Sequence, residues 1–280
     1  MAESKFLVRS FVGRRVLITG GMGFIGSNLA RALVGLGAKV TVVDAMIPEY
    51  GGNREINCRA QLALLEACRK NNPTVRIVFA STRQIYGKPD YLPVDERHPV
   101  RPVDVNGINK AAGEAFHLLY ARVHGLRATA LRLTNTIGPR MRVKDARQTF
   151  VGVWVRQLIE GDMIEVWGGE QQRDFTFVDD AVEAFLLAAA KDEAVGEVFN
   201  LGGSPPVTLL RLAELMVDLN QGGALAVRTF PAERKKIDIG DYYADDRKIA
   251  RMLGWKPRTD LRTALTKTLA YYRKELPHYL

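Results

Sequence analysis

Three glycines in the segment GGMGFIG have the spacing GxxGxxG and directly follow a β-branched run at residues 14–19. A strand that ends in such a loop and a helix that begins there can bind a pyrophosphate. The glycines let it approach the backbone, and the helix N-terminus offers amide donors and a favourable dipole. The alternative is a tight turn without a ligand. The candidate residues are Gly20, Gly23, Phe24, Ile25 and Gly26.

An acidic residue, Asp44, stands about 20 residues beyond this loop, at the end of the next predicted strand. Its carboxylate can accept hydrogen bonds from the ribose hydroxyls of an adenosine, and it would repel a 2′-phosphate. Together with the glycine loop, Asp44 predicts a dinucleotide site that prefers NAD to NADP.

These residues must be positioned by alternating strands and helices. Apolar patterns predict strands over residues 14–19, 38–44, 75–80 and 128–133, and helices over 27–36, 55–70 and 107–124. Such βαβ units imply a parallel sheet with helices on its faces. We therefore predict an α/β fold, a Rossmann-type doubly wound parallel sheet with a smaller C-terminal substrate-binding lobe.

The pattern becomes less regular after residue 138, where we predict helices over 149–160, 181–190 and 209–220 and a strand over 164–167. The predicted dinucleotide-binding domain covers residues 1–135, with 172–200 returning to it. Residues 136–171 and 201–280 form the predicted smaller lobe. A cleft between the two lobes is the expected place for a ligand.

Composition limits the possible partners. The formal net charge is +9, but the basic residues are spread along the 280-residue chain, so we expect no nucleic-acid partner. No run approaches the roughly 20 apolar residues of a membrane helix, so we expect a cytoplasmic protein with no membrane partner. We expect no metal site, because the histidines form no ligand-spaced cluster with Cys58 and Cys68.

Several further blocks stand in a recognisable order along the chain. With these residues the chain resembles the extended short-chain dehydrogenase/reductase family, in particular its NAD-dependent nucleotide-sugar epimerase and dehydratase branch. The blocks are the glycine loop, ASTRQIYG at 80–87, the helix with Lys110, LRLTN at 131–135, GPR at 138–140, RDFTFVDD at 173–180, FNLGG at 199–203 and LGWKP at 253–257.

The resemblance implies three catalytic positions. In the family a Tyr and a Lys, spaced YxxxK on one helical face, work with a Ser or Thr; here these positions are Asn106, Lys110 and Thr82. The lysine is expected to bind the nicotinamide ribose. Asn106 can hold a hydroxyl but cannot act as a general base, so either the base is vacant or the site is rebuilt around the amide. Tyr86 is a less favoured replacement.

The resemblance also implies a nucleotide-sugar substrate, contacted by Asn135, Arg173 and Arg234. The alternative for Arg173 is an ion pair with Asp179 or Asp180. Relatives that eliminate water carry Asp-Glu where this chain has Arg83-Gln84, and decarboxylases usually keep a glutamate at the second of these positions. The favoured activity is therefore epimerisation through a keto sugar with NAD retained. A nucleotide-sugar reductase or dehydrogenase and a non-catalytic binding protein remain the alternatives.

One expected unit is absent from the sequence. Family members carry another strand, helix and strand before the helix at 55–70, and about ten residues after Asp44 cannot contain them. We expect a gap in the sheet, the loss of a loop that lines the cofactor, and a natural chain with a further stretch at this point. A homodimer is also expected, through the helices at 55–70 and 107–124. Leu62, Leu65, Phe116 and Leu119 are its candidate contacts, or else core residues.

Overall fold

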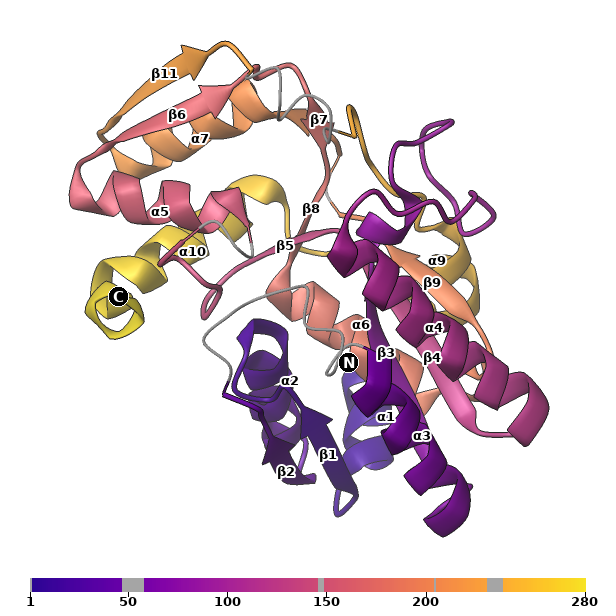
Figure 1. Ribbon diagram of the computed structural model, residues 1–280. Helices are drawn as coiled ribbons and strands as arrows, with labels where there is room; N and C mark the ends of the chain where they lie inside the picture. Colours follow the sequence, from indigo (N-terminus) through magenta and orange to yellow (C-terminus); the bar gives the residue numbers. More distant parts are fainter. Residues whose placement is uncertain (1, 47–57, 146–148, 204, 231–238) are drawn as a thin grey trace.

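The N-terminal part of the chain folds as a helix followed by a strand, a helix and a strand, coloured indigo in Figure 1. The computed structural model describes residues 2–46, 58–145, 149–203, 205–230 and 239–280. After α1 (Ala2–Phe11), β1 (Arg15–Thr19) pairs in parallel with β2 (Lys39–Val43) along its whole length. α2 (Phe24–Gly35) connects the two strands and packs its apolar side against them.

A second parallel sheet has three strands in the order β3 (Arg76–Thr82), β4 (Arg127–Leu133) and β9 (Val198–Leu201). α3 (Ala60–Asn71) and α4 (Val105–His124) cover one face of this sheet, where Leu65, Tyr120 and Leu126 are buried together. α6 (Val178–Ala190) packs on the opposite face. Helices on both faces confirm the predicted doubly wound α/β fold.

The two sheets share no ladder in the described part of the chain, since β1 pairs only with β2 there and β3 only with β4. This confirms the gap expected from the short connection after β2. The halves are joined instead through a common apolar cluster to which α1, α2 and α6 contribute, with Phe11, Leu33 and Leu187 among its members. The proposed further stretch of natural chain stays a prediction.

The β1–β2 sheet has one packed face. Val16, Ile18 and Val40 contact the apolar cluster beneath α2. Leu17 and Val43 alternate with them along the strands and are 54% and 52% exposed. The helix of the absent unit would be expected on this second face, which explains why large apolar side chains face solvent there.

The smaller lobe lies at the upper left of Figure 1 and has its own core. β6 (Met163–Trp167) pairs in parallel with β11 (Ala224–Arg228), and α5 (Phe150–Glu160), α7 (Leu209–Asn220) and α10 (Leu261–Glu275) pack around them. Two short pairs connect the lobes. They are β5 (Asn135–Ile137) with β8 (Phe175–Phe177), and β7 (Gln172–Arg173) with β10 (Val207–Thr208).

The remaining elements are short. They are the 3-10 helices η2 (Arg83–Tyr86), η3 (Asp192–Ala194) and η4 (Leu276–Tyr279), and the helix α9 (Arg247–Leu253). The exact domain boundaries stay a prediction. α9, however, packs on β9 through Ile249 and Leu253, with the first domain rather than with the smaller lobe to which its residues were assigned.

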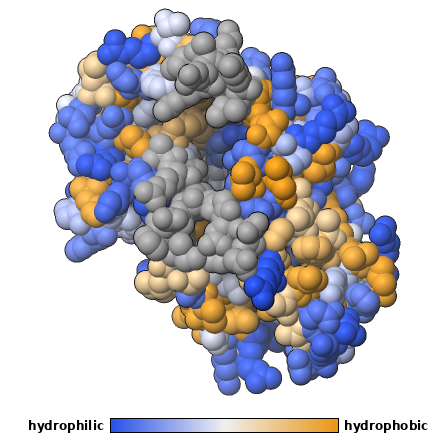
Figure 2. Space-filling view, viewed as in Figure 1, coloured by the Kyte–Doolittle hydropathy of each residue, from blue (hydrophilic) through white to orange (hydrophobic). Residues whose placement is uncertain are grey.

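On the face shown in Figure 2, hydrophilic residues surround several separate apolar patches. Among the described residues, no helix combines the length and the apolar character needed to cross a membrane.

Candidate functional site

The glycine loop has the geometry of a close-approach site. Gly20 has a φ of +68°, in the left-handed region that favours glycine. A Cβ on Gly26 would lie 2.3 Å from Gly20 O, so no larger residue fits where α2 begins. Gly23, the N-cap residue, has no side chain to cap α2, which leaves the first-turn amides of Phe24 and Ile25 to donate to another group.

Asp44 follows β2 and lies beside the glycine loop. Its Oδ2 accepts from the backbone N of Met22 at 2.9 Å, and its Oδ1 accepts from the backbone N of Met46 at 3.0 Å. The carboxylate keeps further lone pairs for ribose hydroxyls. The structure therefore brings together the glycine loop, the α2 N-terminus and Asp44, as the sequence predicts.

Lys110 projects from α4 toward the end of β3. Its Nζ donates to Ala80 O at 2.9 Å and lies 5.1 Å from the centroid of the Phe79 ring. Burial lowers the pKa of the ammonium group to about 8. Only one of its three protons is used in this bond, so Lys110 can still donate to a ribose hydroxyl.

Asn106 lies in the first turn of α4, against η2. A Cβ on the neighbouring Gly107 would lie 2.7 Å from Gln84 O, so this glycine permits the close packing. Asn106 Nδ2 donates to Gln84 Oε1 at 2.5 Å, and Gln84 Nε2 donates to Asp104 Oδ2 at 3.2 Å. Asp104 also caps α4, because its Oδ1 accepts from Gly107 N at 2.7 Å.

Thr82 lies beside this amide pair at the end of β3. Its Oγ1 is 3.5 Å from Gln84 Oε1 and accepts from Gln84 N at 3.3 Å. Thr82 and Asn106 therefore face one small space around the Gln84 side chain. Sequence reasoning used Gln84 only to separate reaction types and did not identify Asp104; the available signal was an Asp at the expected start of a helix.

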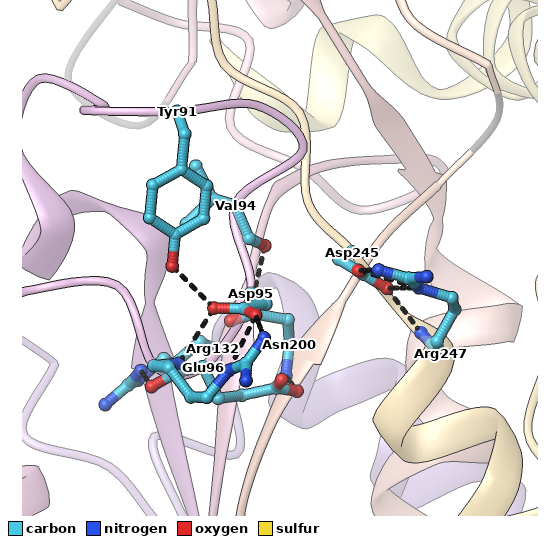
Figure 3. A network of polar contacts seen from close by, with 9 residues as sticks. Tyr91, Val94, Asp95, Glu96, Arg132, Asn200, Asp245 and Arg247 are labelled. Carbon is cyan, nitrogen blue, oxygen red and sulfur yellow. Dashed lines mark hydrogen bonds and ion pairs between the residues drawn. The ribbon is translucent and has the colours of Figure 1, made fainter.

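A buried polar network lies below this space and fixes α4 to the sheet. Glu114 of α4 accepts from Arg132 Nε at 3.0 Å and from Ser81 Oγ at 2.6 Å. Figure 3 shows how Arg132 and Asn200 lie in this region, close to Glu96. Tyr86 donates to Asn200 Oδ1 at 2.7 Å and accepts from Arg132 Nη1 at 2.6 Å.

These contacts exclude Tyr86 as the replacement base. Its side chain is fully buried, and burial raises the pKa of the phenol to about 12. A buried phenol with two partners and such a pKa does not remove a proton from a substrate near neutral pH. Tyr86 is therefore a packing residue that connects β4 and β9.

The predicted substrate residues lie around the short strands that connect the lobes. Asn135 Nδ2 donates to Asp174 O at 3.0 Å. Arg173 is buried and donates to the carbonyl oxygens of Gln172 (2.8 Å) and Gly240. Arg234 lies outside the described residues.

The sequence offered Asp179 and Asp180 as alternative ion-pair partners of Arg173. Asp180 accepts from Thr259 N at 3.0 Å. A guanidinium group binds anionic groups through charge-assisted hydrogen bonds, so an anionic substrate group is a suitable partner for Arg173. Its role, like that of Asn135, stays a prediction.

Comparison with known proteins identifies the family. The model of the NAD dependent epimerase/dehydratase family matches residues 16–54 and 48–202. This chain belongs to that family. The two matched segments overlap at residues 48–54, where the sequence is too short for the expected strand, helix and strand. The resemblance stated from the motifs is thus confirmed.

Relatives with several activities are similar to this chain. The putative UDP-glucose 4-epimerase of Methanocaldococcus jannaschii is 31% identical over 81% of this chain and 71% of its own length. UDP-glucuronic acid decarboxylase 1 of Xenopus tropicalis is 29% identical over 95% of this chain and 73% of its own length. That match spans 322 aligned positions, more than the 280 residues here, as expected if the relative carries an additional segment.

A solved structure with the same fold is the UDP-glucose 4-epimerase of Thermotoga maritima, determined with UDP-glucose. It is 27% identical, with a TM-score of 0.84, and the match covers 94% of this chain and 99% of the other. NAD is the cofactor of the family. The geometry of the glycine loop shows whether this chain can bind it. The left-handed turn at Gly20 and the uncapped α2 N-terminus both fit a dinucleotide pyrophosphate, and Gly26 lets the helix pack closely against the loop.

Proposed function

We propose that this chain is an NAD-dependent nucleotide-sugar epimerase in which Asn106 occupies the position of the catalytic tyrosine. The main support is that Thr82 and Asn106 both contact Gln84 Oε1, at 3.5 Å and 2.5 Å. The two residues matched to catalytic positions therefore face one space at the end of β3, and Lys110 lies on the same helix as Asn106.

The residues of the chain have separate tasks in this proposal. Gly20, Gly23, Gly26 and Asp44 would hold NAD, which supplies the acceptance and return of hydride when it is bound. Lys110 would hold the nicotinamide ribose through its remaining donors. Thr82 and Asn106 would orient a sugar hydroxyl.

The nucleotide-sugar diphosphate would be bound by Asn135, Arg173 and Arg234, because guanidinium groups bind phosphates through charge-assisted hydrogen bonds. The epimerase activity of relatives such as the Thermotoga maritima enzyme supports this assignment. The amide at position 106 favours one alternative, a nucleotide-sugar binding protein without turnover, because an amide does not act as a general base.

Turnover of a panel of nucleotide sugars tests the proposal. An epimerase should convert one of them to its epimer without net consumption of NAD. A dehydrogenase or reductase should change the NAD redox state in proportion to product. A protein that binds a nucleotide sugar by calorimetry and converts none of the panel would contradict the epimerase assignment and support the binding protein.

A further inference from the structure

Asp104 determines which way the Gln84 amide points. Both oxygens of an ionised carboxylate only accept hydrogen bonds, so the partner of Asp104 Oδ2 must be a donor. Gln84 therefore directs its NH₂ group toward Asp104, at 3.2 Å, and its carbonyl oxygen away from it. Asp104 is itself held by the 2.7 Å bond that it accepts from Gly107 N.

The orientation of Gln84 in turn sets that of Asn106. The Gln84 carbonyl oxygen needs a donor, and the Asn106 NH₂ group supplies it at 2.5 Å. Asn106 Oδ1 then points away from Gln84, and no described residue donates to it. The side chain is half-buried, so this oxygen remains accessible as a hydrogen-bond acceptor.

We infer that Asp104 and Gln84 are positioning residues that fix the Asn106 amide with its oxygen toward the substrate. In this arrangement Asn106 accepts a hydrogen bond from a sugar hydroxyl and orients it, but the amide does not itself remove the proton. The inference rests on the proposed nucleotide-sugar function and adds a specificity to it: the site selects a sugar that has a hydroxyl at this position.

The chain offers variants that separate this orientation from a merely structural role. Gln84→Leu removes both bonds, and Asp104→Asn lets the Gln84 amide turn because an asparagine can donate or accept. Asn at position 104 still caps α4, so the helix start is retained. Gln84→Glu combined with Asp104→Asn still accepts from Asn106 Nδ2, because the amide at position 104 then supplies the donor, and this double variant is the conservative rescue. Asp90→Asn, which removes another exposed carboxylate, is the matched control.

The first measurement needs no ligand. In protein labelled with ¹⁵N at asparagine and glutamine side chains, the Asn106 NH₂ protons should exchange slowly in the wild type and in Gln84→Glu combined with Asp104→Asn. They should exchange rapidly in Gln84→Leu. Asn106→Asp assigns the signal by removing it. Equal exchange in the wild type and Gln84→Leu would overturn the positioning role.

The second measurement compares UDP-glucose with its 4-deoxy analogue by calorimetry, because the named relatives act at position 4. The wild type, Asp90→Asn, and Gln84→Glu combined with Asp104→Asn should bind UDP-glucose about tenfold more tightly than the analogue, the usual effect of one hydrogen bond. Gln84→Leu and Asp104→Asn should lose this preference with unchanged affinity for the analogue. A preference that survives in both variants overturns the inference. Slow exchange without binding of either sugar supports the positioning and overturns the proposed function for glucose.

Discussion

At the scale of single residues, the site depends on a lysine in an apolar environment. Burial near Phe79 lowers the pKa of Lys110 to about 8, so the group is protonated below this pH and neutral above it. Because the ammonium form is the stronger donor to ribose, NAD affinity should fall as pH rises from 7 to 9. Lys110→Met should bind NAD more weakly and lose this pH dependence. Calorimetry at several pH values checks both points, and parallel profiles for the two proteins would contradict the role.

Asp44 should determine the choice between the two dinucleotides. Asp44→Asn keeps one acceptor oxygen for the backbone amides of Met22 and Met46, replaces the other oxygen with an NH₂ donor, and removes the negative charge. NAD affinity should fall about tenfold, the value of a hydrogen bond to a charged group, and discrimination against NADP should relax. Calorimetry with both cofactors measures the effect, and a thermal melt controls for unfolding. Unchanged affinity for both would show that the ribose is bound elsewhere.

Asn106→Tyr distinguishes a site that merely lacks its general base from one that has been rebuilt around the Asn106 amide. Because Gln84 Oε1 is 2.5 Å from Asn106 Nδ2, the longer tyrosine ring would meet the Gln84 side chain. We therefore expect no gain from Asn106→Tyr alone and a gain of about 10² in turnover when it is combined with Gln84→Ala. The combined variant should show a new ionisation in its pH-rate profile. Full gain from the single substitution would favour a site that is vacant rather than rebuilt.

At the scale of secondary structure elements, α4 is fixed to the sheet by a buried ion pair. Glu114→Leu would leave Arg132 charged and unpaired in the interior and should lower the free energy of unfolding by about 3–5 kcal/mol. The control Arg97→Ala breaks an exposed pair with Asp95 and should cost less than about 1 kcal/mol. Denaturant unfolding gives both values. If Glu114→Leu combined with Arg132→Met recovers none of the loss, the pair is not its cause.

The elements that the sequence predicted are those with strong periodicity. α7 matches its predicted bounds, and α2, α4, α5, β1 and β4 agree within a few residues, because each has a continuous apolar pattern. Residues 55–57 of the predicted third helix lie outside the described residues. The sequence did not predict α1, α9, α10, β9 or β11. The short pairs β5–β8 and β7–β10 were also missed, because strands of two or three residues carry no measurable alternation.

The sequence predicted the parts of the candidate site in which a motif determines the backbone conformation. It did not predict the side-chain contacts that depend on residues distant in the sequence. The glycine loop and Asp44 follow from spacing alone. The partners of Asn106 do not, because Gln84 precedes it by 22 residues and reaches it only through the packing of α4 against η2. Spacing likewise gave no indication that Glu114 would meet Arg132.

At the scale of the whole molecule, the assembly state stays a prediction. Leu65 is buried and Phe116 packs beside it, so these two belong to the core. Leu62 and Leu119 are 38% and 41% exposed on α3 and α4 and remain available for a partner subunit. We expect a homodimer by light scattering, and Leu119→Asp should convert it to a monomer without a change in fold. A monomer mass for the wild type at micromolar concentration would contradict this.

In the described part of the chain no ladder joins β1 to β3, and this affects how cooperatively the molecule folds. The strand pairs of the β1–β2 sheet form within residues 15–43, so they are close in sequence. β4, in contrast, pairs with β9, which lies near residue 200. Contacts that are local in sequence form early and at a small cost in loop closure, so the N-terminal βαβ unit is a natural first nucleus. In the folded molecule, no continuous strand ladder of the described residues connects the glycine loop to the end of β3. Local unfolding at one of these places therefore does not spread to the other through strand hydrogen bonds. Among the described residues the two halves of the site are joined through the shared apolar cluster rather than through a strand ladder, so we expect them to fluctuate on separate time scales.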